Sequence, residues 1–364
     1  MLINIIDPAL ADRFGHHFDW TLKIIKRLNI LGYKVTIFGN KNISANVKAE
    51  LELYGKVISL FSDNPYSRPN KENPLCSDIQ FYFERSLSLA SELKQINQNC
   101  IWIWPTLFDF QLNALALAKI NCHVTAIIHT APGYRYPAAP AMWRNAAVQA
   151  RKENIDIRLG ATFKELVPLF FPLVEQALFV TPILVDANPP LAPKSTMKRV
   201  GFFGHQSIRK GSKLISDLAQ YLLKAGLEVV VQNSTGKVNG KQSQQLSILG
   251  YIEDFSEEIS KCDLVILPYD SDVYKNMASG VAWEAIARAV PVIAPANTVP
   301  GDFVTSENAG ITFKEFSAHS IIDAVTQASS EFKSIADGAF RASKNWSTNN
   351  GTDKFVEAIL SSRN

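Results

Sequence analysis

A few residues in the second half of the chain have the types and spacing that nucleotide binding requires. Arg209 and Lys210 directly precede Gly211, and Glu284 follows Gly280 by four positions. Two cations beside the free amide groups of a helix start would hold a diphosphate and stabilise it as it leaves. A carboxylate one helical turn away suits neutral hydroxyls, such as those of a ribose. We therefore predict a nucleotide-binding site.

The stretch 263–295 must position Glu284. Its run LVILP is fully apolar, which is typical of a strand buried on both faces. A polar loop follows, and Ser279 and Gly280 then begin an alanine-rich helix that Pro291 ends. The unpaired N–H groups and the dipole of such a helix start suit a phosphate. We predict a βαβ unit that binds a nucleotide where its helix begins.

The composition excludes several classes of protein. Of the 364 residues, 47% are hydrophobic and 20% are charged, and this length is enough for two α/β cores. A net charge of +3 is too small for a nucleic-acid binder. The four cysteines lack metal-ligand spacing, and no signal peptide or membrane-spanning run is visible. We expect a cytoplasmic protein with reduced thiols.

The order of the strand-like and helix-like segments predicts the fold class. The runs LINII, KVTIFG, CIWIW and HVTAIIHT alternate with helical patterns, and the alternation starts again at KRVGFFG. This alternation is typical of parallel, doubly wound α/β sheets. A proline-rich linker at 186–197 separates the two halves. We expect domains at 1–185 and 198–346, the second with its first helix at 209–225, and a final helix within 347–364.

Three segments depart from the predicted alternation. Two are polar loops expected at 61–76 and 234–245, and the third is an aromatic, basic, proline-rich stretch at 131–172. We interpret the third as an irregular helical insert, with internal packing as the favoured explanation of its large side chains. Contact with an acceptor or a membrane is the alternative. The side chains concerned are Trp143, Arg144, Phe163, Phe170 and Phe171.

Four segments, taken in order, resemble the retaining, nucleotide-sugar-dependent glycosyltransferases of the GT-B fold that are grouped as family 4. They are VGFFGHQSIRKG, LGYIEDFSEEISKCDLVILPY, SGVAWEAIARAVPVIAP and NWS. The resemblance covers the chain from Lys198 onward, and the first domain matches only in outline. It implies two Rossmann-like domains facing a cleft, the first on the acceptor side and the second binding the donor. It also implies that the last helix packs back on the first domain.

The resemblance also implies roles for particular residues. Arg209 and Lys210 would stabilise the leaving diphosphate, and His129, at the end of an apolar strand, would lie close to the transferred sugar. The donor would be bound by Gly204, His205, Tyr251, Asn276, Ser279, Gly280 and Glu284. The loop with Gly15 and His16 would lie on the acceptor side. No metal ion is expected, and the DSD run at 270–272 is not interpreted as a metal motif.

Two positions depart from the family pattern. The family usually has an arginine directly after the strand glycine, where this chain has His205. It often has a second glutamate eight positions before Glu284, where this chain has Asn276. An amide can bond sugar hydroxyls but supplies no charge, so the role of that carboxylate is in doubt here.

The expected activity is transfer of a sugar from a nucleoside-diphosphate sugar to a hydroxyl acceptor, with retention of configuration and without a cofactor. The acceptor would be a glycan, a lipid-linked sugar or a small molecule, with peripheral contact to the inner membrane face as a further expectation. A dehydrogenase is disfavoured because no GxGxxG run follows a strand. Two alternatives stay open: a GT-B-shaped sugar-nucleotide epimerase or hydrolase, and a catalytically silent homologue that acts as a binding subunit.

Overall fold

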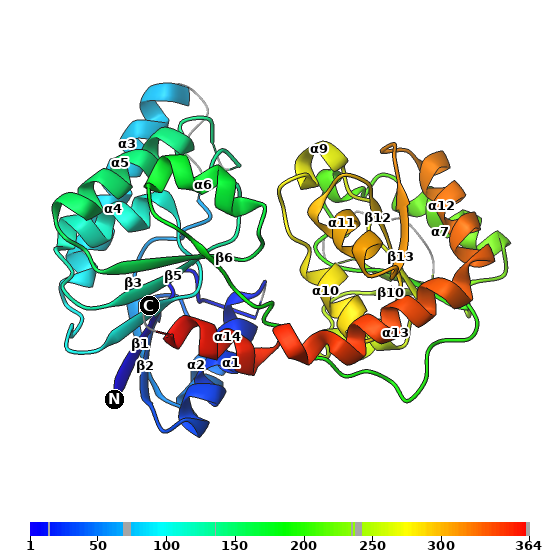
Figure 1. Cartoon of the computed structure of the whole chain (residues 1–364), viewed down its shortest axis with the longest axis horizontal. Helices are drawn as coiled ribbons and strands as arrows, with labels where there is room; N and C mark the ends of the chain where they lie inside the picture. The colour runs from blue at the N-terminus through cyan, green and yellow to red at the C-terminus, as the bar shows by residue number, and fades with distance from the viewer. Residues whose placement is uncertain (14, 68–73, 135, 234–235, 237–241, 362–364) are drawn as a thin grey trace. The chain divides into compact units, whose positions relative to one another are not determined.

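The computed structural model describes residues 1–13, 15–67, 74–134, 136–233, 236 and 242–361. The chain divides into two compact units (Figure 1). One contains Met1–Leu184 and Thr352–Asn364, and the other contains Val185–Gly351. Each unit has its own parallel sheet and its own core.

The first unit is built on a seven-stranded sheet of order β3-β2-β1-β4-β5-β6-β7 with all neighbours parallel. The chain moves outward from β1 in one direction and then, from β4, in the other. Right-handed crossovers therefore place helices on both faces, which makes the sheet doubly wound. The strands are β1 (Leu2–Ile6), β2 (Lys34–Asn40), β3 (Lys56–Phe61), β4 (Ile101–Trp104), β5 (Val124–Ile128), β6 (Ile157–Ala161) and β7 (Phe179–Val180).

The helices of the first unit follow from apolar residues at helical spacing. In the first helix, Phe18, Ile24, Ile25 and Leu28 are buried against the sheet, and Gly32 ends the helix with a left-handed φ of 81°. The helices are α1 (His17–Ile30), α2 (Ala45–Glu52), α3 (Pro74–Leu93), α4 (Asp109–Ala118), α5 (Ala139–Lys152), α6 (Leu166–Val174) and α14 (Thr352–Leu360).

The prediction of an irregular insert at 131–172 was wrong. The segment contains α5, β6 and α6, and β6 lies between β5 and β7 in the sheet. Pro140 lies in the first turn of α5, where proline costs no hydrogen bond, and α6 contains Pro172 in its interior. Trp143 and Phe170 are buried against each other with ring centroids 5.0 Å apart, whereas Phe171 is exposed.

The second unit repeats the architecture with a six-stranded parallel sheet of order β10-β9-β8-β11-β12-β13. Its strands are β8 (Arg199–Phe202), β9 (Glu228–Gln232), β10 (Leu246–Leu249), β11 (Leu264–Ile266), β12 (Val292–Pro295) and β13 (Gly310–Phe313). Its helices are α7 (Ile215–Lys224), α8 (Phe255–Ser260), α9 (Ser271–Tyr274), α10 (Gly280–Ala287), α11 (Val299–Ser306), α12 (Ala318–Ser330) and α13 (Phe332–Asn349). The predicted fold class, two doubly wound Rossmann-like domains, is confirmed.

The helix predicted at 209–225 begins later than expected. Residues Ile208–Lys210 form a single 3-10 turn, and α7 begins at Ile215. Gly211 separates them with a φ of 72°, and a Cβ atom there would lie 2.0 Å from the carbonyl oxygen of Pro268. The left-handed glycine and its close approach to the loop after β11 therefore prevent a continuous helix.

The end of the chain belongs to the first unit. Helix α14 packs beside α1 (Figure 1), and Phe355, Val356 and Ile359 are buried in the core of that unit. Arg158 donates a hydrogen bond of 2.6 Å to the carbonyl of Ala358. The final helix expected within 347–364 is thus present and spans Thr352–Leu360.

The predicted loops fall partly outside the described residues. Of the loop expected at 61–76, residues 62–67 are described, and α3 begins at Pro74. Of the turn expected at 234–245, residue 236 and residues 242–245 are described. Within the part of the chain that the structure describes, every helix is too short or too polar to cross a membrane.

Candidate functional site

The predicted cations lie where the second sheet reverses its strand order. Arg209 and Lys210 belong to the loop after β8, and the backbone N–H of Asp270, in the loop after the neighbouring strand β11, donates to the carbonyl of Arg209 at 3.0 Å. The Lys210 ammonium nitrogen lies 5.3 Å from the ring centroid of Tyr269, while Arg209 is exposed. Ligands of open α/β sheets bind at this type of position.

The ammonium group of Lys210 and the start of α10 lie close together at Gly204. Its φ is +90°, and its N–H donates to Oε1 of Gln232 at 2.7 Å. A Cβ atom at Gly204 would lie 3.2 Å from Cγ2 of Val281, in the first turn of α10, and 3.5 Å from Nζ of Lys210. The strand glycine, the ammonium group and the start of α10 therefore lie side by side. His205, the next residue, is exposed.

The start of α10 is open to a ligand at Gly280. A Cβ atom there would have no neighbour within 4 Å, and the residue is exposed. Ser279, by contrast, is buried, and its hydroxyl accepts a hydrogen bond of 3.3 Å from the N–H of Ala282. Its side chain therefore caps the helix, and only backbone atoms of this pair are placed to contact a phosphate.

Glu284 is held by two residues that the sequence analysis did not identify. Nη1 of Arg288 lies 2.6 Å from its Oε2, and the hydroxyl of Ser256, on α8, donates to the same oxygen at 3.0 Å. The side chains of Arg288 and Glu284 are only 10% and 14% exposed. The i,i+4 spacing is a signal that could have predicted Arg288. Ser256 comes from a distant part of the chain, and no local pattern points to it.

The remaining predicted donor residues are dispersed. Tyr251 is 57% exposed in the loop after β10, and Asn276 is half-buried in the loop between α9 and α10. No hydrogen bond or ion pair joins either of them to Glu284 among the described residues. Tyr274, in the short helix α9 between Tyr251 and Asn276, is buried with its ring centroid 4.2 Å from that of Tyr269, so it packs in the interior.

The DSD run has a local structural role. The carboxylate of Asp270 caps α9 by accepting a hydrogen bond of 3.0 Å from the N–H of Asp272. In the described parts of the chain, no three His, Cys, Asp or Glu side chains are grouped closely enough to hold a metal ion.

In the first unit, His129 follows β5 and its ring is fixed at both nitrogens. Nε2–H donates to the carbonyl of Pro105 at 2.6 Å, and Nδ1 lies 3.2 Å from the hydroxyl of Thr162. Burial lowers the pKa of His129 to about 4, so the ring is neutral near pH 7.

His16 lies against His129. The two ring centroids are 5.1 Å apart, and Nε2 of His16 lies 3.0 Å from the hydroxyl of Thr106, after β4. Burial, together with the neighbouring rings of His17 and His129, lowers the pKa of His16 well below its usual value. Gly15 has a φ of +78° and open space around it. The two predicted histidines therefore belong to one cluster at the carboxyl ends of β1, β4 and β5.

A chain of three polar side chains completes this cluster, with Asp7 and His17 buried and Tyr66 48% exposed, and no sequence pattern predicted it. Asp7, directly after β1, is 1% exposed, and its carboxylate oxygens lie 2.8 and 3.0 Å from Nδ1 of His17. Nε2 of His17 lies 2.6 Å from the hydroxyl of Tyr66. Asp7 directly follows the first strand, but its partner in α1 is set by the turn between them, which no pattern specifies.

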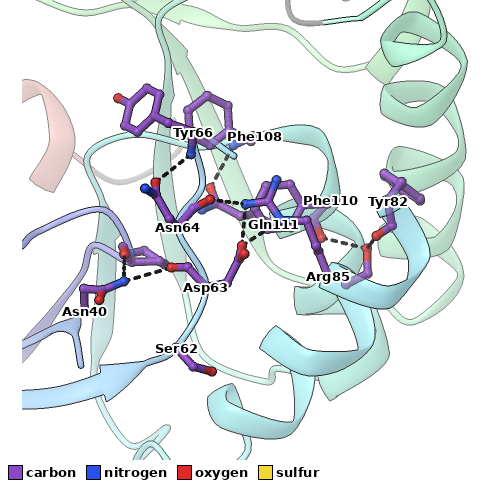
Figure 2. A network of polar contacts seen from close by, with 12 residues as sticks. Asn40, Ser62, Asp63, Asn64, Tyr66, Tyr82, Arg85, Phe108, Phe110 and Gln111 are labelled. Carbon is purple, nitrogen blue, oxygen red and sulfur yellow. Dashed lines mark hydrogen bonds and ion pairs between the residues drawn. The ribbon is translucent and has the colours of Figure 1, made fainter. Parts of the chain in front are cut away.

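Arg85 anchors the loop that carries Tyr66 (Figure 2). Its Nε donates to Asp63 at 2.7 Å, its Nη2 donates to the carbonyl of Asn64 at 2.8 Å, and its guanidinium lies 3.9 Å from the ring centroid of Phe110. The side chain of Asn64 accepts a hydrogen bond from the N–H of Tyr66 at 3.0 Å. The arginine on α3 thus positions the phenol that contacts His17.

The fold is that of the GT-B glycosyltransferases among solved structures. HepE from Anabaena in complex with UDP has a TM-score of 0.70 at 14% identity, covering 99% of this chain and 98% of that chain. Sucrose-phosphate synthase from Thermosynechococcus elongatus has a TM-score of 0.69 at 13% identity, with 99% and 97% covered. The calicheamicin glycosyltransferase CalG4 has a TM-score of 0.62 at 15% identity, with 99% and 98% covered. At such identities the likeness establishes the fold alone.

The second unit also matches a sequence family. The model of the family described as Glycosyl transferases group 1 matches residues 198–331, which include Arg209, Lys210, Glu284 and the start of α10. No curated protein matches the chain significantly. The part of the chain with the predicted nucleotide site is therefore the part that the family match covers.

Proposed function

We propose that the chain is a glycosyltransferase that moves a sugar from a nucleoside-diphosphate sugar to a hydroxyl acceptor. The observation that carries this proposal is the meeting of Gly204, Lys210 and the first turn of α10 at the reversal point of the second sheet. A diphosphate bound there contacts an ammonium group and helix-start amides together. The match of residues 198–331 to a glycosyltransferase family supports a sugar on that diphosphate.

In the proposed reaction, the bond between C1 of the sugar and the diphosphate oxygen breaks, and its electron pair stays on the diphosphate. Arg209 and Lys210 stabilise that charge as it develops. The acceptor oxygen bonds to C1 from the face that the diphosphate leaves, so the anomeric configuration is retained. The acceptor proton passes to the departing phosphate oxygen, which is the anion on that face.

We propose a uridine nucleotide as the donor, since HepE, which shares the fold, was solved with UDP and with UDP-glucose. The reaction is proposed to need no metal ion, because two protein cations supply the positive charge. Activity that persists in excess EDTA would support this point, and activity restored only by Mg²⁺ or Mn²⁺ would contradict it.

The histidine cluster of the first unit is proposed to serve the acceptor and the transferred sugar. Its members from the sequence prediction are Gly15, His16 and His129, and neutral imidazoles can accept or donate a hydrogen bond to a hydroxyl. The acceptor is a glycan, a lipid-linked sugar or a small molecule. A peripheral contact with the inner membrane face is part of the proposal, supported by exposed Phe171 and by exposed Arg144, which donates to the carbonyl of Pro172, the residue after Phe171.

The test is a thermal-shift panel of UDP, ADP, GDP and their glucose conjugates. A nucleotide at about 100 times its Kd stabilises the folded state by about 2.7 kcal/mol, so one base should stand out. Glu284→Ala should remove the shift, while Glu307→Ala, an exposed glutamate in the same unit, should keep it. A wild-type protein stabilised by none of these ligands contradicts the proposal.

Product analysis separates the alternatives. Incubation with the stabilising nucleotide sugar alone, followed by NMR, reveals an epimerase by inversion within the sugar and a hydrolase by release of free sugar. Binding without turnover on any hydroxyl acceptor identifies a silent binding subunit. Transfer to an added acceptor with the donor's anomeric configuration supports the proposed reaction, and inverted product contradicts its stereochemistry.

A further inference from the structure

Two polar side chains among the described residues contact the same oxygen of the Glu284 carboxylate. Ser256 donates to Oε2 at 3.0 Å, and Nη1 of Arg288 lies 2.6 Å from the same atom. Across the described residues, Oε1 accepts no hydrogen bond, and the closest guanidinium contact of Arg288 is with Oε2. Oε1 is therefore the oxygen available to a ligand hydroxyl.

The pair of Glu284 and Arg288 differs from an ordinary surface ion pair. Both side chains are largely buried, and an ion pair removed from water persists only when its geometry and remaining hydrogen bonds are good. Arg288 also donates from Nη1 to the backbone carbonyl of Glu284 at 3.2 Å. The guanidinium is thus fixed to the side chain and to the backbone of the same residue.

The arginine also removes an electrostatic conflict. An unpaired carboxylate near the first turn of α10 would repel a diphosphate bound at the helix start. Paired with Arg288, the Glu284 carboxylate carries little net charge as seen from the ligand, yet keeps an oxygen that accepts hydrogen bonds. Ser256 adds a second anchor from α8, so rotation of the carboxylate would break both contacts.

We propose that Arg288 and Ser256 are positioning residues that direct Oε1 of Glu284 to the ribose hydroxyls of the bound nucleotide. We call the three residues the ribose clamp. The clamp makes the site specific for ribonucleoside over deoxyribonucleoside diphosphates. It rests on the proposed function, because it assumes that a nucleoside diphosphate binds at α10.

The test uses isothermal titration calorimetry to compare the Kd of UDP with the Kd of 2′-deoxy-UDP and of 3′-deoxy-UDP. If the thermal-shift panel selects another base, ADP or GDP and their deoxy forms replace these ligands. A lost hydrogen bond to a charged group should weaken binding of at least one deoxy form about tenfold or more in the wild-type protein. In Arg288→Met, the Kd of that deoxy form divided by the Kd of UDP should fall close to one. Ser256→Ala should reduce it by a smaller factor, and Arg288→Lys should restore part of it.

Arg199→Met is the matched control. Arg199 pairs with Glu258 on α8 at 2.7 Å, so the variant removes an arginine of the same unit without touching Glu284. It should keep the wild-type ratio. Because the ratio compares two ligands on one protein sample, partial unfolding of a variant leaves it unchanged.

The failures can be told apart. If Glu284→Gln removes the discrimination and Arg288→Met keeps it, the clamp is wrong while the proposed nucleotide site stands. If the wild-type protein binds both sugar forms equally, the clamp is also wrong. If no nucleoside diphosphate binds, the proposed function fails together with the clamp.

Discussion

Asp7 and His17 form a buried pair in which Nδ1 of the imidazole lies 2.8 Å from a carboxylate oxygen, although ten positions separate them in the chain. The second ring nitrogen contacts the Tyr66 hydroxyl, so both nitrogens have partners. A carboxylate on Nδ1 fixes the orientation of the ring and favours a proton on that nitrogen. The pair therefore determines which hydrogen bond Nε2 can make in the histidine cluster.

Asp7→Asn should lower the free energy of unfolding by about 1–3 kcal/mol, because a buried hydrogen bond to a charged group is lost. The chain contains a matched exposed pair, Asp156 and His123, with Nδ1 2.9 Å from the carboxylate. Asp156→Asn should change stability by less than about 0.5 kcal/mol. Urea unfolding of both variants checks the difference, and equal effects would show that burial of the first pair has no energetic consequence.

Lys210→Ala should lower kcat/KM for sugar transfer. The loss should correspond to about 2–4 kcal/mol of transition-state stabilisation, as loss of one charge-stabilising donor does elsewhere. Lys213, three positions later and exposed, provides the control, since no atom of it lies within 4 Å of a Cβ at Gly204, whereas Nζ of Lys210 does. Steady-state kinetics with the donor varied gives both values. The assignment of Lys210 to the leaving group is wrong if the two variants have similar kcat/KM.

Gly211→Ala should be strongly destabilising, with a loss of more than about 3 kcal/mol, because the new Cβ combines a left-handed φ with a clash. Its neighbour would be the Pro268 carbonyl oxygen at 2.0 Å. Gly226 also has a left-handed φ, of +80°, but has open space around it, so Gly226→Ala should cost only about 1–2 kcal/mol. Thermal or urea unfolding separates the two costs, and equal losses would refute the close approach to Pro268.

Acidification should destabilise the first unit through His129. Its pKa is about 4 in the folded protein and about 6.5 when exposed, so the unfolded chain binds the proton first as pH falls. This contribution is absent above about pH 6.5 and grows to at most about 3 kcal/mol of lost stability near pH 4. His16, whose pKa is also lowered, adds to the loss in the same direction.

His129→Gln should flatten this pH dependence in urea unfolding measured between pH 7.5 and 4.5. His319→Gln, which changes an 88% exposed side chain on α12, should leave it as in the wild type. An unchanged slope in His129→Gln would mean that another group causes the acid sensitivity.

The sequence predicted what depends on periodicity and on residues close in the chain. Alternating buried strands and amphipathic helices indicated both sheets, and the position of Gly280 and Glu284 on one helix followed from the apolar run before them. The break before α7 could not be predicted, because it depends on the close approach of left-handed Gly211 to Pro268, which is distant in sequence. The insert at 131–172 was misinterpreted because proline was counted against regular structure, whereas Pro140 lies in the first turn of α5 and Pro172 lies within α6.

The partners of the candidate residues were harder to predict than the residues themselves. Ser256 reaches Glu284 from another helix, and Asp7 reaches His17 across a turn, so neither contact has a local signature. Arg288 is the exception, since its i,i+4 spacing from Glu284 is visible in the sequence. Side chains that hold a site in place are determined by tertiary packing more than by local pattern.

The location of α14 bears on how the two units can be produced separately. Because the first unit takes its last helix from beyond residue 351, no single cut yields both units whole. A fragment ending at Leu184 would expose to water the apolar side chains against which Phe355 and Ile359 pack, and it would be prone to aggregate. Residues 185–351, in contrast, are continuous and contain the entire ribose clamp. Nucleotide binding can therefore be measured on that fragment first, while work on the histidine cluster requires the full chain.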